Sequence, residues 1–201
     1  DSDKGSKVLI IEKMAQPGGN TAISSGGFMV PQDGPTALKY LTATYDLANS
    51  EKDDELLNTF CKEIMGVKDW MTGLKEGTEL WVYGHAGFQN LPGWEVIDKY
   101  RVRGKKRSGD CLFDLYRYAV EEKRNIPVML ETPAVQLIQK DGQVVGAVAQ
   151  NNGKNINIKA NKAVILTTGG YEFDPESLRT YAQGENYHAL GNPGNTGDGL
   201  R

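Results

Sequence analysis

The segment that most constrains the fold is residues 7–12 (KVLIIE), a continuous apolar run that ends in an acid. Such a run is typical of a strand buried in a parallel sheet. A glycine- and serine-rich loop follows over residues 14–31 and contains two glycine pairs, Gly18-Gly19 and Gly26-Gly27. Glycine clusters mark tight turns or backbone that lies close to a ligand. The sequence therefore predicts a parallel strand with a glycine loop at its carboxyl end.

Helical and strand patterns follow one another along the rest of the chain. Helices are expected over residues 21–25, 36–48, 53–74 and 110–123. Strands are expected over residues 128–130, 134–140, 144–150 and 155–160, and a buried parallel strand over 163–167 (AVILT). Residues 77–102 mix aromatics with glycine and have no period, so we expect an irregular segment with one short strand.

Two turn signals define the second half of the chain. Asp141-Gly142 and Asn152-Gly153 lie between alternating strands and are typical of two-residue hairpin turns, so an antiparallel β-meander is expected at about 134–160. The order strand, helix, strand, meander, strand predicts an α/β fold, a Rossmann-like dinucleotide-binding domain with a β-meander crossover. Residues of about 36–100 are interpreted as a helical insertion in that domain.

The composition of the chain limits the kinds of partner that it is expected to bind. The formal net charge of −3 argues against nucleic acid, because nucleic-acid-binding proteins carry a basic balance. No stretch approaches the ~18 apolar residues of a membrane span. The basic run 101–107 (RVRGKKR) is interpreted as a solvated loop, with a polyanion site as the alternative. Within it, Arg103, Lys106 and Arg107 could attract an anionic substrate such as a dicarboxylate, although a solvated face is preferred. Cys61 and Cys111 lack CxxC spacing and are interpreted as reduced interior thiols. The sequence assigns no compartment.

The strand end and the glycine loop both suggest a nucleotide ligand. An acid at the position of Glu12 accepts hydrogen bonds from ribose hydroxyls in dinucleotide-binding folds, although an ordinary exposed glutamate is an equal alternative. The motif PGGNT at 17–21 would let backbone amides approach a pyrophosphate, and the helix after it would add a favourable partial charge. Asn20 and Thr21 could cap that helix or bond the ligand. A mobile glycine loop is the alternative for this segment.

Four motifs in order resemble a known family. The segment EKMAQPGGNTAISSGG resembles the loop after the second strand in FAD-dependent fumarate reductase and succinate dehydrogenase flavoproteins. The segment LYRYAVEEKRN followed by TPAV resembles the helix and adenine-contacting strand of that group, and AVILTTGGY resembles its A-T-G-G strand end. The segment NPGNTGDG is similar to its T-G-D-G motif, in the form found in ketosteroid dehydrogenases.

The resemblance implies FAD as the cofactor and assigns roles to single residues. Glu12 would hold the adenosine ribose, and Ala134 would meet the adenine with its backbone. The pyrophosphate and flavin would be lined by Asn20, Thr21, Gly26 and Gly27. Thr168 and Gly169 would pass close to the dinucleotide, with Asp198 near the flavin end. Lys13, Gly19 and Ser25 belong to the same motifs and complete the expected cofactor-binding set.

Two departures from the family pattern limit what the chain can carry. The G-x-G-x-x-G turn of the group lies on its first strand, whereas this sequence begins just before the second strand. In the group, a capping domain with the catalytic arginine and histidines follows the T-G-D-G motif, where this sequence ends. We therefore expect a partial FAD-binding domain over 1–201 that lacks its first strand, with unknown catalytic residues outside it.

The remaining candidates are interpreted as structural. His85 and His188 are the only histidines, and neither has metal-ligand spacing, so no metal is expected. His85 lies in an aromatic loop that could face a substrate, but a structural or surface role is preferred. The aromatic group Trp81, Tyr83, Phe88 and Trp94 is interpreted as core under a long loop, with the floor of a cleft beside the flavin as the alternative.

The resemblance predicts an FAD-dependent oxidoreductase acting on CH–CH bonds. The protein would move hydride between flavin and an activated C=C bond in a small-molecule substrate, a fumarate-like unsaturated carboxylate or an enone steroid. A flavin-dependent amine or amino-acid oxidase is the alternative enzyme, and a non-catalytic nucleotide-binding module is the alternative for the isolated fragment. An electron-donor module outside this chain is possible.

Overall fold

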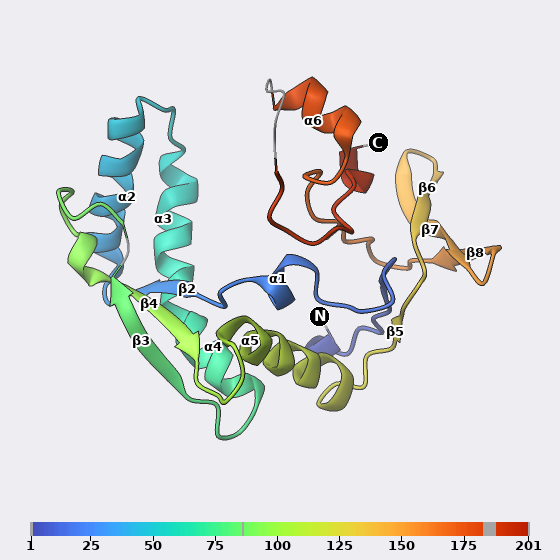
Figure 1. Ribbon diagram of the computed structural model, residues 1–201, viewed down its shortest axis with the longest axis horizontal. Coiled ribbons are helices and arrows are strands. Elements are labelled where there is room, and N and C mark those ends of the chain that lie inside the picture. The colour runs from blue at the N-terminus through green and yellow to red at the C-terminus, as the bar shows by residue number, and fades with distance from the viewer. Residues whose placement is uncertain (1, 86, 183–187, 201) are drawn as a thin grey trace. The chain divides into compact units, whose positions relative to one another are not determined.

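The computed structural model describes residues 2–85, 87–182 and 188–200. Their contacts divide the chain into two compact units. The first unit combines Asp1–Ile23 with Val120–Arg201, and the second is Ser24–Ala119. The predicted insertion of about 36–100 lies inside the second unit. The elements of both units are labelled in Figure 1.

A short parallel strand pair lies at the centre of the first unit. Strand β1 (Ile10–Ile11) pairs in parallel with β5 (Val128–Met129), and Ile10 lies opposite Val128. The pairing extends to Glu12, whose N–H donates to the Met129 carbonyl at 2.9 Å. Parallel pairing was expected for residues 7–12 and only a short strand for residues 128–130, and the ladder is shorter than residues 7–12 predicted. A 3-10 turn (Ser2–Lys4) precedes it.

Three antiparallel strands form the meander of the first unit, as predicted. They are β6 (Ala134–Lys140), β7 (Gln143–Asn151) and β8 (Lys154–Lys159), in the order β6-β7-β8. Figure 1 shows them as adjoining arrows. Both hairpins turn through two residues with positive φ: Asp141 (50°), Gly142 (77°), Asn152 (50°) and Gly153 (73°). Positive φ at both turn residues is the reason that Asp-Gly and Asn-Gly announce these turns in the sequence.

Thr132 joins the parallel pair to the meander. It is fully buried, and its N–H donates to the Glu12 carbonyl at 2.8 Å. Its hydroxyl donates to the Leu130 carbonyl at 2.7 Å and accepts a bond from the Asn151 amide at 2.7 Å. Since Asn151 ends β7, one threonine side chain fixes the meander to the end of the parallel strands.

The expected parallel strand over 163–167 is not formed. Residues 161–171 are extended without a strand partner among the described residues, and Ile165 and Leu166 are 76% and 55% exposed. A strand is defined by hydrogen bonds to a neighbour, and β1 pairs here only with β5. The remaining elements of this unit are short: α1 (Gly19–Ile23), α6 (Pro175–Tyr181) and a 3-10 turn (Asp198–Leu200). Helix α1 begins two residues earlier than expected.

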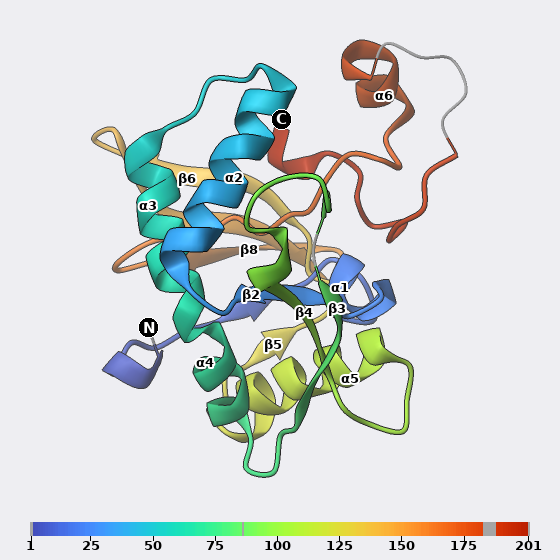
Figure 2. The same ribbon diagram turned by 90° about the vertical axis from the view of Figure 1, so that its left-hand side faces the viewer.

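Helices make up about half of the second unit. They are α2 (Gly34–Ala48), α3 (Asp54–Glu63), a 3-10 turn (Ile64–Gly66), α4 (Val67–Leu74) and α5 (Ser108–Arg117), and a π-helical turn (Tyr118–Glu122) continues α5. Figures 1 and 2 show α2 and α3 side by side. Asp33 and Asp53 accept hydrogen bonds from the first turns of α2 and α3 and begin both helices. None of the described helices has the length and apolar character needed to cross a membrane.

A three-stranded antiparallel sheet in this unit corrects the prediction for 77–102. Its order is β2-β4-β3, with β2 (Phe28–Pro31), β4 (Ile97–Val102) and β3 (Leu80–His85), and a 3-10 turn (Trp94–Val96) precedes β4. A register shift between Val82 and Gly84 interrupts the alternation of β3. In β4 the buried positions include Asp98 and Tyr100, whose polar atoms conceal the apolar pattern. Two strands therefore form where one was expected.

The core of the second unit packs α4 and α5 against β4. Its buried members are Met71, Leu74, Val102, Leu112, Leu115 and Ala119. The buried Asp98 carboxylate accepts hydrogen bonds from Gln32 and the Tyr100 hydroxyl and lies 3.1 Å from His85 Nδ1. His85 also meets the edge of the Trp94 ring at 5.9 Å. These partners explain His85 as a structural histidine. Cys61 and Cys111 are free thiols, the first buried and the second half-buried.

The Thr132 junction predicts a large effect for a small substitution. Thr132→Val keeps the shape of the side chain but leaves the Asn151 amide and the Leu130 carbonyl without this partner. We expect the free energy of unfolding to fall by about 1–3 kcal/mol, measured by chemical denaturation. The matched control is Thr180→Val, because the Thr180 hydroxyl also donates to a backbone carbonyl but is exposed. Equal stability of the two variants would contradict the role of Thr132.

Candidate functional site

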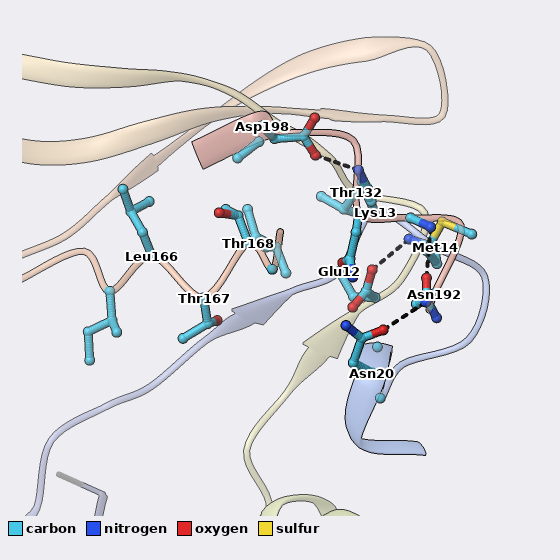
Figure 3. A pocket seen from close by; sticks show the side chains of 18 of the residues that line it. Glu12, Lys13, Met14, Asn20, Thr132, Leu166, Thr167, Thr168, Asn192 and Asp198 are labelled. Atoms are coloured by element: carbon cyan, nitrogen blue, oxygen red, sulfur yellow. Dashed lines mark hydrogen bonds and ion pairs between the residues drawn. The ribbon is translucent and has the colours of Figure 1, made fainter. Parts of the chain in front are cut away.

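A cavity of about 440 Å³ lies in the first unit where the end of β1 meets four other segments. Residues 11–14 and 18–21 line it from the glycine loop, and residues 164–169 line it from the extended segment. The meander contributes Thr132, Ala134, Leu137 and Ala147, and the last segment contributes Asn192, Gly194, Asn195 and Asp198. Figure 3 shows these side chains converging on one space. The cavity is thus built from parts of the chain that are far apart in sequence.

Glu12 places a carboxylate at the mouth of this cavity. Its Oε1 accepts a hydrogen bond from the Met14 N–H at 2.8 Å, which bends the side chain back over the turn that follows β1 (Figure 3). Its backbone is bonded on both sides, to Met129 and to Thr132. The acid is therefore held at a fixed strand end, as a group that accepts hydrogen bonds from a ligand must be.

The glycine turn is shaped by positive φ angles. Gly18 has a φ of 120° and Gly19 a φ of 47°, and α1 starts at Gly19. A side chain at Gly19 would meet no protein atom within 4 Å. This position is therefore a glycine because of its backbone conformation, and its open side adjoins the cavity.

Asn20 does not cap α1 but connects it to Glu172 and to the segment that contains Asn192. Its amide donates to Glu172 Oε1 at 3.0 Å, and its oxygen accepts the Asn192 N–H at 2.7 Å (Figure 3). The same Glu172 oxygen accepts the Asn195 amide at 2.6 Å. Hydrogen bonds from Asn20, the Glu172 backbone and Asn195 hold the pKa of the Glu172 carboxyl below its usual value. We call Asn20, Glu172 and Asn195 the amide–carboxylate cluster.

Lys13 connects the strand end to the last described segment. Its ammonium donates to the Thr196 hydroxyl at 2.7 Å and forms an ion pair with Asp198 (Figure 3). Thr196 in turn donates to the other Asp198 oxygen at 3.0 Å. The lysine is the one cation among the described residues that line the cavity. Its charge is matched by Asp198 within the protein.

Nine of the twelve predicted cofactor-binding residues line this cavity. They are Glu12, Lys13, Gly19, Asn20, Thr21, Ala134, Thr168, Gly169 and Asp198. The other three, Ser25, Gly26 and Gly27, belong to the second unit. There, a side chain at Gly26 would collide with the backbone of Ser108, and one at Gly27 with the Tyr83 hydroxyl. Packing therefore explains why both positions are glycine. Contact of the twelve residues with a ligand stays a prediction.

Sequence reasoning missed four residues of the site. Thr132, Glu172, Asn192 and Asn195 were not predicted, although they fix or line the cavity. Glu172 follows the Gly169-Gly170 pair, and Asn192 and Asn195 lie within the NPGNTGDG motif. For Thr132, Asn192 and Asn195 the available signal was their position inside recognised motifs, whereas Glu172 lies just outside one. Their function depends on contacts across 20 to 170 residues of sequence, which local patterns do not reveal.

The chemistry of the cavity suits a dinucleotide. A carboxylate at a strand end can accept hydrogen bonds from two vicinal hydroxyls of a ribose. The backbone amides of a glycine turn can approach phosphate oxygens. Leu137, Ala147 and Val164 provide apolar surface for a planar ring. Acceptor, glycine turn and apolar wall are therefore all present in one cavity, and they fit the parts of FAD that the family resemblance assigns to them.

Comparisons with known proteins agree with this assignment. Residues 2–201 match the family described as "FAD binding domain". A fumarate reductase (cytochrome) of Shewanella frigidimarina is 28% identical over 210 residues, covering 99% of this chain and 35% of the relative. A urocanate reductase of Eggerthella lenta is 29% identical over 192 residues, covering 90% and 30%. The chain spans about a third of the length of these curated relatives.

Solved structures show the same fold. A 3-ketosteroid Δ1-dehydrogenase from Sterolibacterium denitrificans superposes with a TM-score of 0.86 at 18% identity, over 99% of this chain and 50% of that protein. The open conformation of a flavocytochrome c3 fumarate reductase gives a TM-score of 0.82 at 24% identity, over 99% and 36%. The mixed α/β fold is thus that of flavoprotein FAD domains. The chain belongs to the FAD binding domain family, and its cofactor is FAD.

Proposed function

We propose that this chain is the FAD-binding part of an oxidoreductase that transfers hydride between flavin and the activated C=C bond of a small unsaturated carboxylate. The observation that carries the proposal is the cavity in which nine separately predicted residues converge. The substrate class is supported by two sequence relatives named for fumarate and for urocanate, both unsaturated carboxylic acids. An enone steroid is less supported, because the steroid enzymes resemble this chain at 18% identity, where likeness informs on fold alone.

Different cavity residues would bind different parts of the cofactor. Glu12 would accept the adenosine ribose hydroxyls, and the turn at Gly19 would present backbone amides to the pyrophosphate. Ala134 would meet the adenine beside the apolar Leu137 and Ala147, which line the same wall. FAD supplies the hydride chemistry, and the protein supplies binding and orientation.

The amide–carboxylate cluster would hold together the segments that line this cavity. Glu172 holds Asn20 and Asn195 at once, and these two residues come from different segments that line the cavity. Asn195 is buried, and a side chain at Gly169 would collide with it. The cluster therefore sets the distance between the glycine turn and the last segment, across which the cofactor would lie.

The finer fold belongs to the same proposal. We infer that residues 163–167, which are extended without a strand partner among the described residues, would become a further strand of the parallel sheet that contains β1 once a neighbouring strand is present. The exposure of Ile165 and Leu166 supports this, because β-branched and apolar residues of a parallel strand are normally covered on both sides. A strand carrying G-x-G-x-x-G, from a segment outside residues 1–201, would complete the Rossmann-like arrangement. Catalytic groups and an electron-donor module would likewise be supplied from outside this chain.

Glu12 can be tested by substitution in the protein that carries this chain. Glu12→Gln should weaken FAD binding by about 10- to 100-fold, because a charge-assisted acceptor for the ribose is lost. ADP, which contains the same ribose, should lose affinity by a similar factor when titrated calorimetrically. Glu131→Gln is the control, since Glu131 is exposed and does not line the cavity. An unchanged FAD affinity in Glu12→Gln would remove Glu12 from the site.

Glu172 predicts how FAD retention depends on pH. Its pKa is lowered in the folded protein, so its contribution is complete above the ordinary value of 4.5 and is lost as pH falls through the lowered pKa. Glu172→Gln should bind FAD about tenfold more weakly at pH 7, and the gap to wild type should close in the acid range. Dialysis against buffers of decreasing pH, followed by flavin absorbance, measures this. Glu176→Gln, an exposed acid of α6, should behave as wild type.

The chemistry predicts which compounds reoxidise the reduced flavin. The purified holoprotein is photoreduced without oxygen, and fumarate, urocanate or a simple cyclic enone is then added. We expect flavin absorbance to recover with an unsaturated carboxylate, faster than with the enone, and not with succinate, which has no C=C bond. The proposal fails if no conjugated acceptor restores the absorbance while an amine or amino acid reduces the oxidised flavin.

A further inference from the structure

The geometry points to a carboxylate-binding subsite in the second unit, formed by Arg101 with Tyr83, that recognises the acid group of the substrate. This inference rests on the proposed function, because it assigns the residue that selects an unsaturated carboxylate over an uncharged enone. Neither residue was among the predicted site residues. The sequence placed Arg101 in a basic run interpreted as a solvated loop, whereas it lies in strand β4.

Arg101 lies on the sheet among aromatic side chains. Its guanidinium carbon is 4.0 Å from the centre of the Tyr83 ring, and Trp81 is its partner in the β3–β4 register. The Trp81 and Tyr83 rings are 6.0 Å apart. Both rings are 36% exposed, so the surface that surrounds the guanidinium is open to solvent and able to receive a ligand. Stacking on Tyr83 also fixes the plane of the guanidinium.

The charge of Arg101 is unmatched in this unit. No described carboxylate of the unit pairs with it, and its Nε is buried without a hydrogen-bond partner. The next two arginines along the chain differ: Arg103 pairs with Glu79 at 3.4 Å, and Arg107 with Asp110 at 2.9 Å. No described carboxylate thus neutralises the Arg101 guanidinium, which leaves its charge available to an acceptor that is not part of this unit.

A carboxylate is the acceptor that this arrangement fits. The guanidinium fork matches the two oxygens of a planar carboxylate, and the Tyr83 hydroxyl adds a possible donor. That hydroxyl lies against Gly27, so closely that a side chain there would collide with it. Gly27 is one of the residues assigned to the flavin by the family resemblance. The subsite would therefore hold a carboxylate next to the backbone stretch that is proposed to adjoin the reacting ring.

Binding is tested in the oxidised holoprotein without an added electron acceptor, so that a saturated acid can pass at most one hydride to each flavin, and flavin absorbance records whether it does. Succinate and imidazole propionate, the saturated products of fumarate and urocanate reduction, are titrated while tryptophan fluorescence and calorimetric heat are recorded. We expect Arg101→Gln to weaken the better-bound acid about 30-fold and Arg101→Lys about fivefold, because lysine keeps the charge but loses the fork. Arg103→Gln is the matched control, since it removes the same charge two residues away and should bind as wild type.

Turnover measurements distinguish an effect of Arg101 on substrate specificity from an effect on the structure of the protein. Arg101→Gln should raise KM for the unsaturated acid by a factor similar to its loss of succinate or imidazole propionate affinity, with kcat less affected. The rate with an uncharged enone should not change. Flavin absorbance and thermal unfolding check that each variant retains FAD and its fold. If Arg101→Gln does not retain them, the same affinities and KM values are measured with Arg101→Lys.

The outcomes distinguish the two proposals. Wild-type protein that binds neither acid, or a folded Arg101 variant that binds them unchanged, overturns the subsite. An equal loss with acids and with the enone also overturns it, because a merely structural arginine would act on both. Acid binding that depends on Arg101, in a protein whose reduced flavin no conjugated acceptor reoxidises, supports the subsite and overturns the proposed reaction.

Discussion

The main chain of Glu12 is the constraint on which the first unit depends. Its N–H bonds Met129 and its carbonyl accepts from Thr132, so the strand end is held from both sides. Thr132 then carries the constraint to Asn151 and the meander. One residue thus aligns the parallel pair, the β-meander and the acid that faces the cavity. The position of the carboxylate is a consequence of backbone pairing, which is more rigid than any side-chain contact at the surface.

A second constraint acts across the cavity, and it explains what the sequence could not reveal. Glu172 gathers two amides from segments separated by more than 150 residues. Nothing in its neighbourhood announces this, because the partners meet only when the chain is folded. Glu12 was predictable since its signal is local: an acid after a buried strand and before a glycine loop. The meander was predictable for the same reason, from Asp141-Gly142 and Asn152-Gly153, whose positive φ angles suit no other common pair as well.

The strands that were missed or wrongly predicted also show the difference between local signals and contacts made only in the folded chain. The β4 pattern includes a buried aspartate, stable there because Gln32 and Tyr100 donate to it, and alternation of apolar residues cannot reveal a buried acid. Residues 163–167 have the opposite problem. Their composition is that of a buried strand, but strand formation needs a neighbour that the described residues of this unit do not provide. Propensity describes what a segment can do, and pairing decides what it does.

The glycines that first suggested a ligand carry less of the argument than the acid does. Gly26 is required by the Ser108 backbone and Gly27 by the Tyr83 hydroxyl, whatever the protein binds. Gly19 is required by its φ angle. Glu12 has no comparable internal reason, because among the described residues its side chain accepts one hydrogen bond, from the Met14 N–H two residues along, which an asparagine or serine could also accept. A full carboxylate at that strand end is best explained by a ligand rich in hydroxyl donors, and a ribose is such a ligand. The acid and the family membership therefore support the proposed cofactor site more than the glycines do.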